Sequence, residues 1–271
     1  MKNYSPENLS SDFVAQYEAF VQSVGPGSML RMAPTPSGFL HRGNLLNFYL
    51  NWHAARSKGA RLLLRIDDLD ADRKRPEYVA GIFETLHHAG FDWDIGPGTG
   101  MTDTARCVAD FEACWSQHHR IDLYNELLAR LRDTGLLFAC RKSRKDIAAA
   151  GGVYPPDFRE QGLSLDDPDV AWRIRTAGLD PTMQDFVVRR RDGIPAYQVA
   201  SVADDLHFGV SHIIRGEDLE PSTRAQIWLA GLLGETAFGK IRFLHHPLLR
   251  NERGEKLSKS AGDGIRRNYS P

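Results

Sequence analysis

Apolar residues in the first part of the chain recur with the spacing of a helix, a buried strand, a second helix and a second strand. Residues 13–21 are apolar at helical intervals, and the breaker Gly25-Pro26-Gly27 follows them. The apolar run at 29–33 ends in a proline-rich turn, which predicts a buried strand opening onto a loop. The helical period returns at 44–56, and residues 61–66 have the pattern of another buried strand.

A strand, a helix and a second strand in such close succession predict a βαβ unit with two parallel strands. Ligands of parallel sheets bind at the carboxyl ends of the strands. We therefore expect chemistry in the loop at 34–43 and at the strand end at 67–70.

The middle of the chain is less regular and predicts an inserted subdomain over approximately residues 92–190. It holds a Gly/Pro loop at 96–98, a strong helical pattern at 120–132 and the breaker Gly151-Gly152. The α/β alternation then resumes, so the sheet is completed late in the chain. Apolar runs lie at 196–202, 211–214 and 241–244, and a helical pattern lies at 221–233.

Composition narrows the class of protein. With 34 Lys and Arg against 35 Asp and Glu, the net charge of −1 excludes a strongly basic polyanion-coating protein. The 42% of hydrophobic residues is typical of a globular chain and excludes disorder of the whole. No apolar stretch approaches the ~18 residues of a membrane span, and the polar N-terminus has no secretory signal. Three cysteines without a disulfide framework fit a reducing compartment, so we expect a soluble, cytoplasmic protein.

The first candidate for chemistry is the start of the second helix, where Gly43 and Asn44 follow His41. A helix N-terminus presents free N–H groups and the positive end of its dipole to a phosphate. Gly43 lets a nucleotide approach the backbone, and His41 can donate to a phosphate oxygen. A histidine that merely caps the helix explains the same residues, so both interpretations stay open here.

Two later segments are further candidates. Lys256 and Lys259 lie among glycines, which suits a loop that closes over a polyphosphate, although a solvated basic tail has the same composition. Arg215 and Asp218 follow the run at 211–214. Arginine there can hold a carboxylate and Asp218 can accept from a ribose hydroxyl, although a surface ion pair is equally compatible.

Taken together and in this order, the segments resemble the class I aminoacyl-tRNA synthetases, and within them the glutamyl branch. Residues 41–44 are similar to the HIGH-type element and 256–260 to the KMSKS-type element of that family. Arg65-Ile-Asp-Asp-Leu-Asp70 is similar to the family's Arg-Ile-Glu-Asp-x-Asp. The similarity runs from about residue 29 to 265 and includes the segments 31–38, 117–124, 197–201 and 204–218.

This resemblance implies an α/β fold with a Rossmann-like parallel sheet in the nucleotide-binding domain. The segment at approximately 92–190 would be an inserted acceptor-binding α/β subdomain. In these terms residues 1–28 are an N-terminal helical extension, 29–265 the catalytic domain and 266–271 a C-terminal tail.

The resemblance also implies a ligase that activates glutamate with ATP to an adenylate and passes the glutamyl group to tRNA. Such an enzyme positions its reactants and stabilises charge on the phosphoryl oxygens, with Mg²⁺ bound together with ATP. By the resemblance, the catalytic residues are His41, Lys256 and Lys259; the ATP-binding residues are His41, Gly43, Asn44, Asp218, Leu219 and Lys259; the glutamate-binding residues are Arg31, Ala33, Thr35, Asp67, Tyr197, Ser201 and Arg215.

The sequence departs from the family pattern in three respects. Asp67 is one methylene shorter than the usual glutamate, and Ser201 stands where asparagine is common. Eleven residues follow Ser260, whereas full-length members continue with an anticodon-binding region. The chain therefore resembles the truncated glutamyl-Q-tRNA(Asp) synthetases, which attach glutamate to the queuosine base of tRNA.

Those truncated relatives usually carry zinc on a Cys-x-Cys pair followed by Tyr-x-x-x-Cys. The corresponding residues here are Phe138-Ala-Cys140 and Tyr154 to Phe158, so we expect no zinc and no other metal site. Cys107, Cys114 and His118 have offsets that place them on one helical face, for which packing is the favoured interpretation.

The acceptor is the least determined part of the function. The basic segments 141–145, 189–191 and 266–267 are candidates for contact with RNA phosphates, and solvated faces explain them about as well. One alternative is a tRNA-independent ligase with a small-molecule or protein acceptor. Another is a non-catalytic RNA-binding module. We expect no membrane contact and, by default, a monomer.

Overall fold

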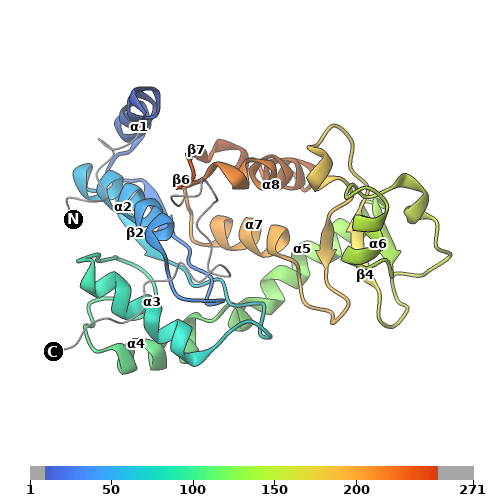
Figure 1. The fold of residues 1–271 in the computed structure, drawn as a ribbon, viewed down its shortest axis with the longest axis horizontal. Helices are drawn as coiled ribbons and strands as arrows, with labels where there is room; N and C mark the ends of the chain where they lie inside the picture. The colour runs from blue at the N-terminus through green and yellow to red at the C-terminus, as the bar shows by residue number, and fades with distance from the viewer. Residues whose placement is uncertain (1–9, 250–271) are drawn as a thin grey trace. The chain divides into compact units, whose positions relative to one another are not determined.

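The protein, described here over residues 10–249 in a computed structural model, is an α/β chain that divides into two compact units (Figure 1). Within the described residues, the first unit comprises 10–119, 209–218 and 241–249, and the second comprises Arg120–Phe208 and Leu219–Lys240. Residues 92–119, which the sequence assigned to the insertion, pack with the first unit. Within the described range, no helix is both long and apolar enough to cross a membrane.

The first unit contains the predicted βαβ arrangement. Strand β1 (Met29–Met32) pairs in parallel with β2 (Arg61–Leu64), and helix α2 (Arg42–Ser57) connects them. The pairing continues past the strands, since Arg65 N donates to Met32 O and Asp67 N donates to Pro34 O. The loop after β1 and the segment after β2 therefore leave the sheet together.

A second parallel pair of strands in this unit is formed by β6 (His212–Gly216) and β7 (Arg242–His246). Ser211 N donates to Met29 O at the start of β1, whereas Ile214 O accepts from Asn47 and Asn51 midway along α2. Strand β6 consequently runs beside β1 in the same direction. The spatial order is β2, β1, β6, β7, and the carboxyl ends of β1, β2 and β6 share one edge.

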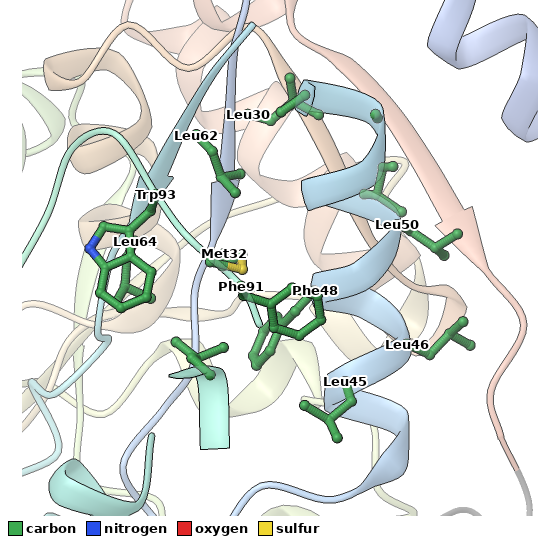
Figure 2. Close-up of a cluster of buried hydrophobic side chains, with 14 of the residues drawn as sticks. Leu30, Met32, Leu45, Leu46, Phe48, Leu50, Leu62, Leu64, Phe91 and Trp93 are labelled. Atoms are coloured by element: carbon green, nitrogen blue, oxygen red, sulfur yellow. The ribbon is translucent and has the colours of Figure 1, made fainter. Parts of the chain in front are cut away.

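Alternation along the strands decides which side chains meet the core (Figure 2). Leu30 and Met32 of β1 join Leu62 and Leu64 of β2 in the cluster formed with α2. Because successive side chains of a strand point to opposite faces, Arg31 points away from this cluster. The same cluster also contains residues of α2 and of the segment that follows α3: Leu45, Leu46, Phe48, Leu50, Phe91 and Trp93 (Figure 2).

Helices cover the rest of the first unit. Helix α1 (Ser11–Ser23) is capped by Ser10, and its Tyr17 hydroxyl donates to Leu50 O at 3.0 Å. It buries Phe13, Tyr17, Phe20 and Val21, as its helical pattern predicts. The others are α3 (Pro76–His88), α4 (Thr104–Asp110) and a π-helical turn at Phe111–Trp115.

The second unit combines an antiparallel sheet with helices. Strands β3 (Leu137–Cys140), β4 (Ala171–Ile174) and β5 (Val187–Arg189) are ordered β3-β4-β5. Asp204 is fully buried and accepts from Arg120 at 2.7 Å and from the Tyr124 hydroxyl at 2.8 Å, which joins α5 to α7. The helices are α5 (Ile121–Asp133), α6 (Arg144–Ala149), α7 (Tyr197–His207) and α8 (Glu220–Leu232).

Candidate active site

The loop after β1 ends in a histidine cap on helix α2. Gly43 N donates to His41 Nδ1 at 3.1 Å, and His41 N donates to Asn44 Oδ1 at 3.0 Å. A Cβ on residue 43 would lie 3.1 Å from the imidazole ring, so a glycine there makes room for the cap. Since Nδ1 is an acceptor, the neutral ring carries its hydrogen on Nε2, which can donate to a phosphate oxygen. Capping and phosphate binding are thus compatible roles for His41.

Buried charged residues gather at the carboxyl ends of β1 and β2. Arg65 donates to Asp67 through Nε at 2.6 Å and Nη2 at 3.1 Å, and both side chains are almost entirely buried. Arg31 is 6% exposed and lies one strand away on the same face. A bidentate guanidinium fixes the direction of a carboxylate, so Asp67 is set to accept from a cation.

Arg215 brings a further guanidinium to this edge from β6. Its relative exposure is 3%, and its guanidinium lies 5.0 Å from the centre of the Phe243 ring. Ile214 faces the α2 core, so its neighbour Arg215 points to the same face as Arg31. Arg31, Arg65 and Arg215 together suit a ligand that carries a carboxylate or a phosphate.

Strand β6 ends at Gly216. A Cβ on residue 216 would lie 2.6 Å from Asp218 Oδ1 and 3.0 Å from Leu248 Cδ2, so both side-chain ends would have to shift to admit one. Asp218 itself is exposed directly beyond the strand, in the position predicted for a ribose contact. Burial lowers the pKa of the neighbouring His246, whose ring is thereby kept neutral.

The remaining predicted residues are placed as follows. Ala33 and the exposed Thr35 lie in the first unit, in the loop that carries His41. Tyr197 starts α7 and is 42% exposed, while Ser201 on the same helix is buried, with no partner for its Oγ in the described residues. Leu219 precedes α8, so these three belong to the second unit. Lys256 and Lys259 lie outside the described residues.

Sequence reasoning missed Arg65 as a site residue. Its signal was available, since residues two apart on a strand share a face, and Arg65 and Asp67 are two apart. The resemblance to the family implied a substrate contact for Asp67 only, so the role of Arg65 was not predicted.

The predicted helical face of cysteines and histidines is interrupted. Cys107 is buried in α4, as packing predicts, but Cys114 is exposed in the π-helical turn and His118 lies in a 3₁₀ turn. Among residues 10–249 no group of three or more His, Cys, Asp and Glu side chains is placed to hold a metal.

Two of the basic segments meet at one end of the second unit's sheet. Strands β3 and β5 flank β4 and both run antiparallel to it, so residues 141–145 and 190–191 leave the sheet at the same end. Arg191 donates to the carbonyl of Arg141 and joins the two segments directly. Residues 266–267 lie outside the described range.

Comparison with known proteins assigns most of the chain to a family. Residues 29–151 and 159–268 match the family model described as class I tRNA synthetases (E and Q), catalytic domain. The Glutamyl-Q tRNA(Asp) synthetase of Pseudomonas fluorescens is 39% identical over 244 residues, which cover 85% of this chain and 75% of that protein. The Synechococcus enzyme of the same name is 39% identical over 238 residues, which cover 84% and 72%.

A solved structure shows the same fold. The glutamate-tRNA synthetase of Elizabethkingia anophelis superposes with a TM-score of 0.69 at 23% identity. The match covers 88% of this chain and 53% of that one, so the chain spans about half the length of the solved protein.

Proposed function

The chain belongs to the catalytic-domain family of the class I tRNA synthetases for glutamate and glutamine, and on that premise we propose that it is a glutamyl-Q-tRNA(Asp) synthetase-like ligase. It activates glutamate with ATP and transfers the glutamyl group to tRNA. The named relatives match over most of their own length, which supports this activity over the other branches of the family.

The observation that carries the proposal is the pair of buried arginines, Arg31 and Arg215, on one face of neighbouring strands. Two guanidinium groups suit the side-chain carboxylate of glutamate better than the neutral amide of glutamine, because a charged acceptor makes the stronger hydrogen bonds. Asp67, aimed by Arg65, suits the substrate ammonium. Thr35, Ala33, Tyr197 and Ser201 are proposed to complete the amino-acid contacts.

The phosphates of ATP are assigned to the start of α2. The free N–H groups of this helix and Nε2 of His41 favour the negative charge that develops on the phosphoryl oxygens. Gly43 and Asn44 fix the cap, and Asp218 with Leu219 is assigned to the adenosine. Lys256 and Lys259 are proposed to neutralise the leaving pyrophosphate, and Mg²⁺ is expected to accompany ATP.

In the first step, the α-carboxylate of glutamate attacks the α-phosphate in line and pyrophosphate leaves. The residues above hold the two reactants and stabilise charge, and no covalent bond to the protein is needed. In the second step an acceptor hydroxyl attacks the adenylate carbonyl and AMP leaves.

The acceptor is assigned to tRNA because the basic segments 141–145 and 189–191 converge at one end of the second unit's sheet. Clustered positive charge binds phosphates irrespective of base sequence, so this surface suits a folded RNA. A monomer in the cytoplasm remains the expectation for the protein as a whole.

Two measurements test the proposal. ATP–pyrophosphate exchange should depend on glutamate and should be weak with glutamine or aspartate; exchange that ignores the amino acid would refute the assigned pocket. Radiolabelled glutamate should then enter tRNA that contains queuosine, with the ester mapped to that base. Labelling of the 3′ ribose, of a protein or of a small molecule would instead establish one of the alternative acceptors.

A further inference from the structure

A compact cluster in the second unit lies where the resemblance implies a zinc site. The four implied ligand positions are 138, 140, 154 and 158, at the end of β3 and in the segment that follows α6. Here Phe138 and Phe158 occupy two of them, and an aromatic ring offers zinc no donor atom. The residues present therefore do not fit a tetrahedral zinc ion.

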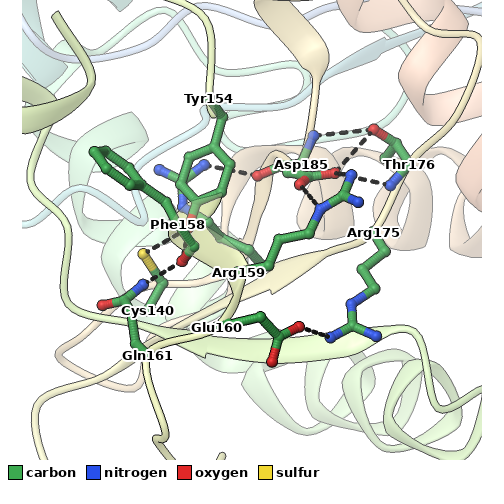
Figure 3. Close-up of polar contacts among 10 residues, drawn as sticks. Cys140, Tyr154, Phe158, Arg159, Glu160, Gln161, Arg175, Thr176 and Asp185 are labelled. Atoms are coloured by element: carbon green, nitrogen blue, oxygen red, sulfur yellow. Dashed lines mark hydrogen bonds and ion pairs between the residues drawn. The ribbon is translucent and has the colours of Figure 1, made fainter. Parts of the chain in front are cut away.

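The side chains at the remaining two positions, Cys140 and Tyr154, contact each other (Figure 3). Cys140 Sγ and Tyr154 Oη lie 3.2 Å apart, and Lys142 N donates to the same sulfur at 3.3 Å. Tyr154 Oη donates to Phe158 O at 2.8 Å, so its hydrogen is committed to that carbonyl.

Positively charged side chains surround this cluster. The Arg173 guanidinium lies 4.3 Å from the centre of the Tyr154 ring, and Lys142 Nζ lies 4.6 Å from that of Phe158. Phe138 and Tyr154 pack with ring centres 5.8 Å apart. Cations on ring faces stabilise an aromatic cluster, whereas they repel a divalent metal.

An ion pair links the segment that carries Phe158 to the turn before β5. The neighbouring Arg159 donates to Asp185 at 2.5 Å and 3.0 Å, and the Asp185 side chain is fully buried (Figure 3). Thr176 N also donates to Asp185, at 3.0 Å. Asp185 adopts a positive φ of 48°, a conformation that a non-glycine residue keeps when its surroundings demand it.

We propose that these contacts form a metal-free clasp, made of Phe138, Cys140, Tyr154, Phe158, Arg159 and Asp185, which closes the second unit in place of a zinc ion. The hydrogen-bonded thiol and phenol join β3 to the segment at 154–158. The ion pair joins that segment to the turn before β5. The clasp is independent of the substrate, so it stands or falls separately from the proposed function.

The clasp is tested first on the unaltered full-length protein. Elemental analysis should find zinc far below one atom per chain, and a zinc-selective chelator with magnesium in excess should leave the melting temperature unchanged. Stoichiometric zinc, or a chelator-induced fall in melting temperature, would overturn the proposal.

Substitutions then test the geometry and the ion pair. Phe138→Cys combined with Phe158→Cys should gain about one zinc per chain, because three thiols then lie beside the Tyr154 oxygen, whose proton is released when the metal binds; a folded double variant that takes up no zinc would refute the alignment of these positions. Asparagine tolerates the left-handed backbone at position 185, so Asp185→Asn removes the ion pair without adding strain. This variant should lower the melting temperature on the order of 10 °C.

The matched control is Glu160→Gln, which breaks the neighbouring exposed pair with Arg175, whose distance is 3.2 Å. Its melting temperature should stay within about 1 °C of the unaltered protein. An equal effect of Asp185→Asn and Glu160→Gln would refute the role assigned to the ion pair, whatever the double cysteine variant does.

Discussion

Each unit holds an Arg–Asp pair with a buried carboxylate, Arg65–Asp67 in the first and Arg159–Asp185 in the second, but the pairs have different sequence spacing and different consequences. Arg65 and Asp67 are two residues apart at a strand end, while Arg159 and Asp185 are 26 residues apart. The first pair lies among other buried arginines at the edge where ligands of parallel sheets bind, and the second ties two loops together. We therefore propose that similar chemistry serves recognition in the first unit and closure in the second, with location deciding which.

The largest expected effect is the loss of Arg215. Arg215→Gln should lower kcat/KM for glutamate in ATP–pyrophosphate exchange by roughly 100-fold or more, because the substrate carboxylate loses a buried charged partner. The KM for ATP should change little. Arg61→Gln, an exposed arginine at the start of β2, is the control and should behave like the unaltered protein. A small effect of Arg215→Gln would refute the proposal that the first unit binds the amino acid through Arg215.

A smaller effect is expected for the residue that aims Asp67. Arg65→Lys keeps the charge but loses the bidentate geometry, so KM for glutamate should rise about tenfold with kcat nearly unchanged. Arg56→Lys is the matched control, since Arg56 also contacts carboxylates, Asp92 and Asp94, but at the surface. If Arg65→Lys instead lowers both kcat and the melting temperature, Arg65 has a structural role like that of Arg159.

Acid should weaken the first unit through its buried histidines. Burial lowers the pKa of His53, His212 and His246 in the folded state, so the unfolded chain binds protons first as pH falls. Stability should be fully present above the unfolded value of about 6.5 and decline below it. Denaturant midpoints measured from pH 7.5 to 5 check this sign, and His212→Gln should flatten the curve; a midpoint that rises on acidification would contradict it.

The smallest effect is expected where a pair is exposed. Arg132 and Asp166 form a close pair in the second unit, but their side chains are 43% and 67% exposed. Asp166→Asn should shift the melting temperature by about 1 °C or less, because exposed pairs contribute little. A loss as large as that of Asp185→Asn would show that burial is not what separates these two pairs.

Much of the fold was predictable because its signals are local. The periods at 44–56 and 120–132 and the strands flanking α2 depend on residues close in sequence, and the structure confirms them. The His41 cap was likewise predictable, because it joins residues within one turn. The run at 196–202 proved to lie in helix α7, since a short apolar run does not distinguish a strand from a buried helix.

The contacts that the sequence did not reveal are distant in the chain. The meeting of residues 141–145 with 189–191 requires the antiparallel pairing of three short strands. The partnership of Arg159 with Asp185 requires the turn before β5. Neither leaves a periodic pattern, because each residue is chosen by a partner that only folding brings near.

By itself, the sequence determined the α/β class, the βαβ unit, the resemblance to glutamyl synthetases and the residue types offered for recognition. The tertiary structure decided that Arg31, Arg65 and Arg215 share one face, that Cys140 contacts Tyr154, and that Arg159 pairs with Asp185. The physical reason is that hydrogen bonding and side-chain periodicity act over a few residues, whereas buried charges and packed rings are satisfied by whichever residues the finished fold places beside them.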